Sequence, residues 1–217
     1  MAMKRKLAGV DEAGKGPVIG PMVVCGVAAE SGEFEELRRL GVKDSKALSR
    51  NRREELYSEI VERCEVEIRV IEADELNELM NDLTINEILY QTYSGIISSL
   101  KPDLAYVDSS DINSERLSRR LSEETGIEVI AMHKADSKRV EVAAASIVAK
   151  VVRDRRIDEI KEELGGFGSG YASDPRTVEF LKEYYRKNGH FPGHVRLKWK
   201  TLSRIAEEVS QRTLFEF

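Results

Sequence analysis

The start of the chain decides its fold, in the stretch Leu7-Ala8-Gly9-Val10-Asp11-Glu12-Ala13-Gly14-Lys15-Gly16-Pro17. The apolar run 7–10 predicts a strand, which ends at two adjacent carboxylates. The Gly-Lys-Gly turn after them lets backbone N–H groups approach a phosphate or a sugar closely, and its lysine adds a positive charge. Because carboxylate oxygens attract divalent cations, this combination indicates phosphodiester chemistry.

The same stretch nearly matches a nucleotide-binding P-loop, with Gly9 and Gly14-Lys15 at the required spacing. Gly16 disfavours that interpretation, because the position needs Ser or Thr to hold Mg²⁺. Asp11 and Glu12 would also lie inside the phosphate cradle and repel a triphosphate. An ordinary surface turn is a further alternative, since Asp-Glu pairs are common on protein surfaces.

Strand and helix patterns alternate through the middle of the chain. Apolar or alternating runs predict further strands at 22–29, 66–70, 104–107 and 127–131. Capping residues and helical spacing predict helices at about 49–64, 84–100, 114–125, 140–164, 174–189 and 197–211. The pattern therefore predicts a mixed α/β sheet followed by a helical C-terminal part.

Two further aspartates follow predicted strands. Asp108 comes directly after the strand 104–107, and Asp136 lies in a polar loop after the strand 127–131. Ligand sites in open α/β sheets favour the edge at which strands end, so these carboxylates can converge with Asp11 and Glu12. Taken singly, each aspartate would more commonly cap a helix or face solvent. Taken together, they would repel one another unless a divalent cation bound among them.

The stretch Asp11-Glu12-Ala13-Gly14-Lys15-Gly16-Pro17 resembles the signature of the type 2 ribonucleases H, the ribonuclease HII family. The likeness continues in family order over nearly the whole chain, through Val42-Lys43-Asp44-Ser45-Lys46, Tyr106-Val107-Asp108-Ser109, His133-Lys134-Ala135-Asp136, Ala143-Ala144-Ala145-Ser146-Ile147-Val148-Ala149-Lys150 and Ser169-Gly170-Tyr171-Ala172-Ser173-Asp174-Pro175. It implies the ribonuclease H-like fold, a five-stranded mixed sheet flanked by helices, with a C-terminal helical extension. We expect a catalytic domain at 1–165, a helical cap at 166–210 and a tail at 211–217.

The resemblance implies a metal-dependent endoribonuclease. It would hydrolyse the RNA strand of RNA–DNA hybrids and cut 5′ of ribonucleotides embedded in duplex DNA, leaving 3′-hydroxyl and 5′-phosphate ends. Its catalytic and metal-holding residues would be Asp11, Glu12, Asp108 and Asp136, with Mg²⁺ or Mn²⁺ as the cofactor.

The 2′-hydroxyl is the group that separates RNA from DNA locally. In the family, the turn that matches Gly14, Lys15 and Gly16 contacts the ribonucleotide at an RNA–DNA junction, and the tyrosine that matches Tyr171 engages the adjacent deoxyribose. A core tyrosine in a glycine-rich turn is the alternative for Tyr171. The candidates for phosphate contacts are Lys46 and Lys134, which lie in matching motifs, and also Lys43, Lys150 and Arg153.

Composition narrows the class of protein. The 217 residues suit one domain with a small appendage, and the net charge of −5 argues against a general DNA-coating protein. The stretch 182–204 is basic, with seven Lys or Arg and one acid, and it carries aromatic residues, which favours nucleic-acid contact.

Cys25 and Cys64 are isolated and are expected to be buried free thiols. His190 and His194 flank Pro and Gly, which disfavours a helical zinc pair. With no apolar run near ~20 residues and no signal peptide, we expect a cytoplasmic monomer.

The last seven residues resemble the short box with which partners bind a sliding clamp. A glutamine is followed by an aliphatic residue three positions later and by an aromatic residue three after that, as Gln211, Leu214 and Phe217. One helical turn would place Leu214 and Phe217 on the same side for an apolar pocket. Many such boxes carry two aromatic residues, and such tails otherwise pack on their own domain. We predict clamp binding, which favours an archaeal source.

Two other functions compete. Ribonuclease HIII shares the catalytic fold, but this chain lacks room for the additional N-terminal domain of that family. A non-catalytic, clamp-associated binder of junctions would bind without metal-dependent cutting, and the complete set of four carboxylates argues against it.

Overall fold

The computed structural model describes residues 5–109 and 113–215, with side chains described as far as Gln211. The described residues form two compact units. Unit 1 comprises 5–13, 23–70 and 84–153, and unit 2 comprises 14–22, 71–83 and 154–215. Each unit thus gathers separate segments, whereas the expected domains followed the chain. The boundaries after 165 and 210 therefore stay predictions.

Unit 1 contains nearly all of a five-stranded sheet with the strand order β3-β2-β1-β4-β5. Its strands are β1 (Lys6–Ala13), β2 (Met22–Glu30), β3 (Glu65–Ile71), β4 (Leu104–Asp108) and β5 (Glu128–Met132). β1 pairs antiparallel with β2 and parallel with β4, and β4 pairs parallel with β5. The mixed five-stranded sheet is therefore confirmed.

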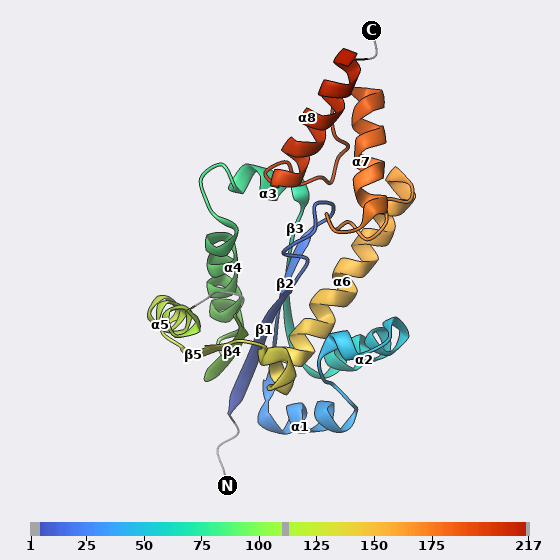
Figure 1. The fold of residues 1–217 in the computed structure, drawn as a ribbon. Coiled ribbons are helices and arrows are strands. Elements are labelled where there is room, and N and C mark those ends of the chain that lie inside the picture. Colours follow the sequence, from blue (N-terminus) through green and yellow to red (C-terminus); the bar gives the residue numbers. More distant parts are fainter. Residues whose placement is uncertain (1–4, 110–112, 216–217) are drawn as a thin grey trace. The chain divides into compact units, whose positions relative to one another are not determined.

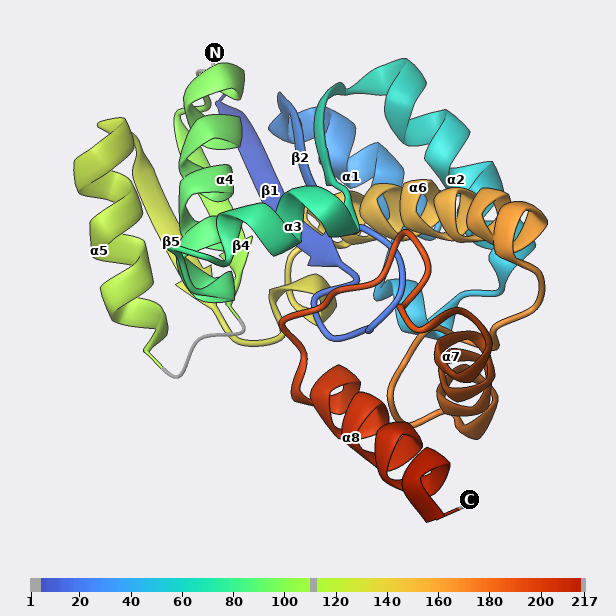
Figure 2. The ribbon, with the colours of Figure 1, turned by 90° about the horizontal axis from the view of Figure 1, so that it is seen from above.

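Helices cover both faces of this sheet (Figures 1 and 2). One face carries α4 (Ile85–Leu100) and α5 (Ser114–Thr125), and the other carries α1 (Ser31–Arg39), α2 (Arg50–Arg63) and the first part of α6 (Val140–Leu164). Successive side chains of a strand point to opposite faces. On the second face, Val23 and Val27 therefore pack with Phe34, Leu56 and Val148 in one core.

Two glycines let helices lie directly against the strands. A Cβ at Gly9 of β1 would stand 2.0 Å from the backbone carbon of Glu141 on α6, and one at Gly26 of β2 would stand 2.3 Å from Ile96 on α4. Both distances are far below van der Waals contact, so only glycine fits. Because Gly9 and Asp11 share a face of β1, the approach at Gly9 brings α6 next to Asp11.

Most predicted helix ends are confirmed. Ser49, Thr84 and Asp174 each accept a hydrogen bond from a backbone N–H in the first turn of their helix, and Gly126 and Gly189 end theirs in the left-handed conformation. The prediction missed α1 and α3 (Ala73–Leu79), which are rich in acidic residues. The final helix, α8, runs over Lys200–Phe215 rather than 197–211.

Unit 2 has a core of its own. It contains α3, the part of α6 from residue 154 onward, α7 (Pro175–Asn188) and α8. Buried Val18 and Ile19 pack there with Phe167, Leu181 and Leu202. The segment that carries the Gly-Lys-Gly turn is therefore part of this helical core.

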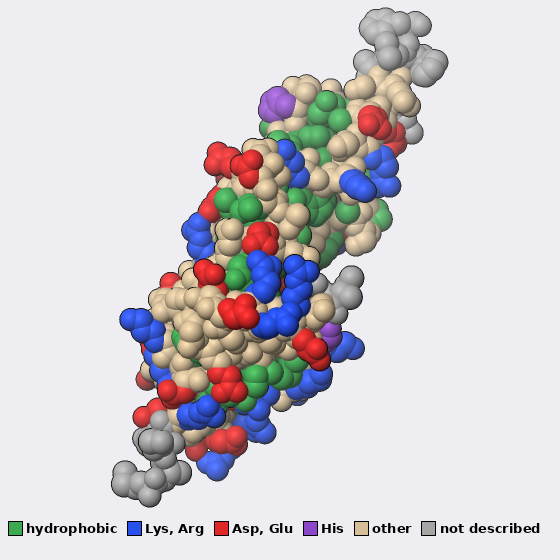
Figure 3. Space-filling model, turned by 90° about the vertical axis from the view of Figure 1, so that its left-hand side faces the viewer, with side chains coloured by type: hydrophobic (Ala, Val, Ile, Leu, Met, Phe, Trp, Pro, Cys, Tyr) green, Lys and Arg blue, Asp and Glu red, His purple; other side chains and the backbone are tan. Residues whose placement is uncertain are grey.

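Acidic and basic side chains are interspersed on the face shown in Figure 3. Arg120 of α5 and Glu87 of α4 form an ion pair at 3.1 Å. No helix among the described residues is long and apolar enough to cross a membrane. Both cysteines are free thiols, as predicted, although Cys64 is only partly buried.

Candidate active site

Asp11 and Asp108 lie at the same level on neighbouring parallel strands. The register of β1 and β4 sets Val10 opposite Val107, so the two aspartates come next on each strand and share one face. Asp108 is the last residue of β4. β1, however, does not end at Asp11 as expected. It continues to Ala13, because Glu12 and Ala13 still pair with β2.

Asp136 reaches the same place from a 3₁₀ turn, η2 (Ala135–Ser137). The backbone N–H of Ala135 donates a hydrogen bond of 2.6 Å to Oδ1 of Asp108, which ties the turn to the end of β4. Lys134 bends the chain before the turn by adopting the left-handed conformation, with a φ of 55°. The Asp136 side chain is thereby buried, with 5% of its surface exposed.

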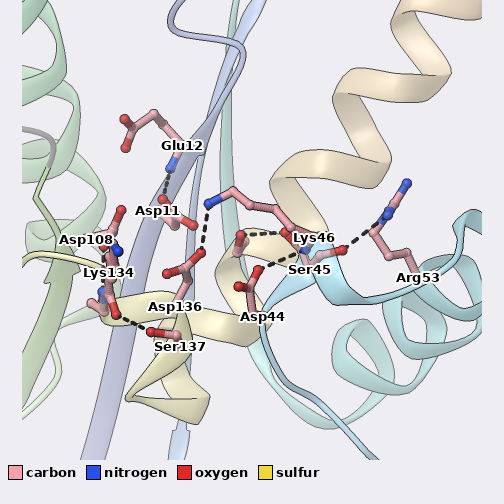
Figure 4. A network of polar contacts seen from close by, with 12 residues as sticks. Asp11, Glu12, Asp44, Ser45, Lys46, Arg53, Asp108, Lys134, Asp136 and Ser137 are labelled. Atoms are coloured by element: carbon pink, nitrogen blue, oxygen red, sulfur yellow. Dashed lines mark hydrogen bonds and ion pairs between the residues drawn. The ribbon is translucent and has the colours of Figure 1, made fainter.

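Asp11, Asp108 and Asp136 are grouped around one space (Figure 4). The pKa of Asp11 is raised well above its usual value, first by burial and then by the charges of Glu12 and Asp108. Burial also raises the pKa of Asp108, and the charge of Asp136 adds to the effect. A hydrogen bond from Ser146 to Asp11 offsets only part of this. Ionisation of this group is therefore disfavoured in the absence of a cation, and a bound cation would stabilise the ionised form.

Glu12 points to the opposite face of the sheet. Asp11 faces α6, where Ser146 donates to it, whereas Glu12 accepts a hydrogen bond from the phenol of Tyr93 on α4. Burial and the charge of Glu12 raise the pKa of Tyr93, so its phenol keeps the proton that it donates. The structure thus brings Asp11, Asp108 and Asp136 together and holds the Glu12 side chain aside.

The donor set fits a hard divalent cation. All four predicted ligands are carboxylates, and Mg²⁺ and Mn²⁺ prefer oxygen donors. Among the described residues, no three His, Cys, Asp or Glu side chains are already arranged as a metal cage. Each carboxylate instead has a protein partner, which is Ser146, Tyr93, Ala135 or Lys46. Bringing the four onto one ion therefore requires side-chain rotation, above all at Glu12.

Lys46 reaches the cluster from a second 3₁₀ turn, η1 (Ser45–Ala47), and forms an ion pair of 3.2 Å with Asp136. Asp44 caps that turn by accepting from the backbone N–H of Lys46, and the hydroxyls of Ser45 and Ser146 lie 3.0 Å apart. Burial lowers the pKa of Lys46, but the hydrogen bond and attraction from Asp136 outweigh it, so the pKa is raised. Lys46 is therefore a cation whose side chain is 80% exposed beside the carboxylates.

A hollow of about 250 Å³ lies beside Asp136. Four cationic side chains line it, those of Arg38, Lys43, Lys138 and Arg139. Arg139 is fixed there by an ion pair of 2.7 Å with Glu141, and its guanidinium lies 3.7 Å above the ring of Tyr106. Asp44 and Asp136 also line the hollow, and its four cations suit a phosphate group. Of the other predicted phosphate contacts, Lys134 is exposed, Lys150 is partly buried and Arg153 is buried, and none of the three lines this hollow.

In unit 2, the predicted ribose-reading turn lies next to Tyr171. A Cβ at Gly16 would stand 3.7 Å from Cε1 of Tyr171, and the N–H of Val18 donates to the carbonyl of Gly170 at 2.8 Å. Tyr171 is 41% exposed, so it is not the core tyrosine of the alternative interpretation. The structure therefore brings the turn and this tyrosine together.

Comparison with known proteins identifies the family, because the family model for Ribonuclease HII matches residues 8–202. The chain belongs to the ribonuclease HII family. It is a ribonuclease H, an endoribonuclease that acts on RNA–DNA hybrids, in a family that depends on divalent metal. This assignment decides against the ribonuclease HIII alternative.

Similar ribonucleases HII come from archaea. The chain is 55% identical to Ribonuclease HII of Archaeoglobus fulgidus, over 97% of this chain and 99% of that protein. A solved PCNA:RNase HII complex from the same organism has a TM-score of 0.84 at 58% identity, covering 89% of this chain and 95% of that one. The solved structure of ribonuclease H2 from Pyrococcus horikoshii OT3 has a TM-score of 0.89 at 42% identity, covering 95% of this chain and 99% of that one. The solved structure of Bst-RNase HIII in complex with Mn²⁺ has a TM-score of 0.81, covering 96% of this chain and 71% of that one. At 22% identity, this likeness shows the fold alone.

Two side chains that were not predicted from the sequence hold the glycine turn. Arg196 is fully buried and donates to the carbonyl oxygens of Gly14 (2.6 Å), Lys15 (3.0 Å) and Gly20 (2.9 Å). Nε1 of Trp199 donates to the carbonyl of Gly16 at 3.2 Å. The basic stretch 182–204 predicted nucleic-acid contact, and for Arg196 that prediction is wrong because no part of its side chain is exposed.

Tyr93 and Ser146, which bind two of the carboxylates, were also missed. Tyr93 lies within the predicted helix 84–100 and is buried there. Ser146 stood within a matching motif and was the only hydroxyl in that helical run, which was a usable signal. Of the predicted clamp box, Gln211 is exposed on α8. The Leu214 side chain and Phe217 lie outside what the structure describes, so the box stays a prediction.

Proposed function

We propose that this ribonuclease HII cuts 5′ of a ribonucleotide embedded in duplex DNA, as well as within the RNA strand of hybrids, and leaves 3′-hydroxyl and 5′-phosphate ends. Mg²⁺ or Mn²⁺ would be held by Asp11, Glu12, Asp108 and Asp136. The observation that carries this proposal is the buried Asp11, with its raised pKa, beside Asp108 and Asp136. Like charges kept together in this way favour a cation.

The four carboxylates would divide the work. Asp11, Asp108 and Asp136 would hold the cation on the α6 face of the sheet, and Glu12 would complete the set by rotating toward them from Tyr93. A bound divalent cation supplies Lewis-acid stabilisation of the charge on the phosphate. The ammonium of Lys46 would contact a phosphate oxygen next to Asp136, and the cationic hollow would hold a phosphate further along the strand.

The turn formed by Gly14, Lys15 and Gly16 would read the 2′-hydroxyl. A glycine backbone allows the close approach that this contact needs, and Gly14 has a φ of 84° that suits glycine. Tyr171, exposed beside Gly16, would pack against the neighbouring deoxyribose. Lys134 would contact a phosphate from its exposed position.

The decisive experiment uses a DNA duplex that carries one ribonucleotide, incubated with the protein and Mg²⁺. An all-DNA duplex and the Asp108→Asn variant are the controls. A single cut 5′ of the ribonucleotide, absent from both controls, supports the proposal. Cleavage of long hybrids alone would contradict the action on single ribonucleotides, and normal cutting by Asp108→Asn would contradict the role of Asp108.

We also propose that the C-terminal tail binds a sliding clamp through Gln211, Leu214 and Phe217. Support comes from the sequence of the tail and from the solved complex of the Archaeoglobus fulgidus relative with PCNA. Surface plasmon resonance on an immobilised archaeal clamp should show binding by the whole chain and loss of binding by Phe217→Ala. Cleavage without the clamp should be equal for both. Undiminished clamp binding by Phe217→Ala would exclude the box.

A further inference from the structure

The turn at Gly14, Lys15 and Gly16 is held by side chains that lie about 180 residues further along the chain. The guanidinium of Arg196 donates separately to the carbonyls of Gly14, Lys15 and Gly20. The indole of Trp199 donates to the carbonyl of Gly16. Every carbonyl of the turn is therefore bound from one side.

Arg196 is itself fixed in place. Its guanidinium lies 5.1 Å from the ring of Trp199, and its backbone N–H donates to the carbonyl of Val18 at 2.9 Å. Asn77 of α3 bonds to both neighbours of Arg196, donating to the carbonyl of Val195 at 2.8 Å and accepting from the N–H of Leu197 at 2.7 Å. With no surface exposed, the arginine cannot serve as a nucleic-acid contact.

The bound carbonyls determine where the N–H groups of the turn point. The described residues contain no cis peptide bond, and in a trans peptide unit the C=O and the N–H point in opposite directions. The carbonyl of Gly14 shares its unit with the N–H of Lys15, and the carbonyl of Lys15 shares its unit with the N–H of Gly16. Arg196 therefore turns both N–H groups away from itself. The positive guanidinium that donates to these carbonyls also polarises the peptide units and strengthens their N–H groups as donors.

We propose that Arg196 and Trp199 are positioning residues for recognition of the ribonucleotide. They hold the turn so that the N–H groups of Lys15 and Gly16 are ready to donate to a ribose oxygen, and Arg196, which is fully buried, does not touch the substrate. This inference rests on the proposed function of the turn. It extends the specificity machinery to the segment 195–199, which the reaction itself does not use.

The test compares equilibrium binding, with Ca²⁺ in place of Mg²⁺, to a DNA duplex with one ribonucleotide and to the all-DNA duplex of the same sequence. Arg196→Lys keeps the positive charge but has a single head group that cannot span three carbonyls. Arg196→Gln removes the charge, and Trp199→Phe removes the N–H donor while keeping an aromatic ring next to Arg196. Arg156→Gln is the matched control, because Arg156 is in the same unit and pairs with Glu72 and Glu159, away from the turn.

Arg196→Lys and Arg196→Gln should lose about ten- to a hundredfold in preference for the ribonucleotide, the usual range for hydrogen bonds from a charged group. Trp199→Phe should lose about fivefold, as for one neutral hydrogen bond. Affinity for all-DNA and the preference of Arg156→Gln should stay at wild-type values, since phosphate contacts are unaffected.

A purely structural role would lower binding to both duplexes equally, and that result would overturn the inference. If Arg196→Gln fails to fold by circular dichroism, Trp199→Phe and Arg196→Lys still decide it. Folded Arg196→Lys and Trp199→Phe proteins with wild-type preference would also overturn it. A wild-type protein that neither prefers nor cuts the ribonucleotide duplex would overturn the proposed function, and this inference with it.

Discussion

The phenol of Tyr93 on α4 donates a hydrogen bond to the carboxylate of Glu12 on β1. Glu12 and its neighbour Asp11 point to opposite faces of the sheet, so the two adjacent carboxylates depend on different helices. Asp11 is bound by Ser146 of α6. Side chains from both layers of helices therefore bind the proposed ligands, with Ser146 holding Asp11 in the site and Tyr93 holding Glu12 outside it.

Replacing Tyr93 with phenylalanine should lower the Mg²⁺ concentration that half-maximal cleavage needs. The phenol holds Glu12 aside, so its loss frees Glu12 to rotate toward the three aspartates, and breaking one hydrogen bond to a charged group costs about ten- to a hundredfold. A titration of cleavage rate against Mg²⁺ measures the shift. Tyr90→Phe is the control, because Tyr90 lies on the same helix and bonds to the Arg120 carbonyl instead. An unchanged Mg²⁺ titration for Tyr93→Phe would show that the contact has no role in the site.

Replacing Asp11 with asparagine should stabilise the metal-free protein at neutral pH. A pKa raised above 3.8 means that the folded state disfavours the ionised form, so stability falls as the pH rises from the unfolded pKa through the folded one. The neutral amide removes this cost, and each kcal/mol should appear as about 2–4 °C in Tm. Mg²⁺ should raise the Tm of the wild type and leave that of Asp11→Asn unchanged.

Scanning fluorimetry in EDTA and in Mg²⁺ measures both effects. Asp82→Asn is the control, since Asp82 is exposed and should respond like the wild type. A lower Tm for Asp11→Asn in EDTA would refute the idea that charge repulsion destabilises the cluster.

Local sequence patterns predicted most of the helices and strands, because the signals for each one lie in adjacent residues. The apolar run of β2 and the Ser49, Thr84 and Asp174 caps needed no knowledge of distant contacts. α1 escaped prediction because it buries only Phe34 and Leu37 in a sequence otherwise dominated by acids and arginines. Its helical state depends on packing against the sheet.

The site was predictable only in part. The spacing of motifs identified Asp11, Asp108 and Asp136. The strand was predicted to end at Asp11, however, so the alternation that turns Glu12 toward α4 was not predicted. Arg196 could not be assigned from its own neighbourhood, since its partners lie 176 to 182 positions away. A charge count treats a buried arginine and an exposed one alike.

Replacing Lys46 with alanine should weaken substrate binding more at low salt than at high salt, and should reduce the slope of log affinity against log salt by about one. The reason is that a phosphate contact releases one counterion. Binding to the ribonucleotide duplex at several salt concentrations measures the slope. Arg63→Gln, which removes an exposed charge in the last turn of α2, should leave the slope unchanged. An unaltered slope for Lys46→Ala would confine Lys46 to its pair with Asp136.

Replacing Gly16 with alanine should leave the fold intact and suppress cleavage at a single ribonucleotide. The new methyl group would meet only the ring of Tyr171, at an ordinary 3.7 Å, so the protein tolerates it. A sugar that must approach the turn would meet the methyl group directly. We expect an unchanged Tm and a fall in kcat/KM of about a hundredfold, by the scale of misplacement effects in active sites. Wild-type cleavage by Gly16→Ala would argue that the ribose does not approach Gly16.

Replacing Gly9 with alanine should destabilise the protein severely. Its Cβ would stand 2.0 Å from the Glu141 backbone carbon, and neither β1 nor α6 can yield as a flexible side chain would. Overpacking usually costs 1–3 kcal/mol, and a clash between two backbones should exceed about 3 kcal/mol. Gly95→Ala is the opposite control, because Gly95 is an exposed position of α4 with nothing within 4 Å, and alanine there should stabilise by about 0.5–1 kcal/mol. Urea unfolding measures both.

Since Gly9 shares its strand face with Asp11, any Gly9→Ala protein that still folds must have moved α6 away from β1, and Ser146 with it. Its cleavage rate should then fall further than its stability alone accounts for, and full activity in that protein would show that Ser146 does not position Asp11.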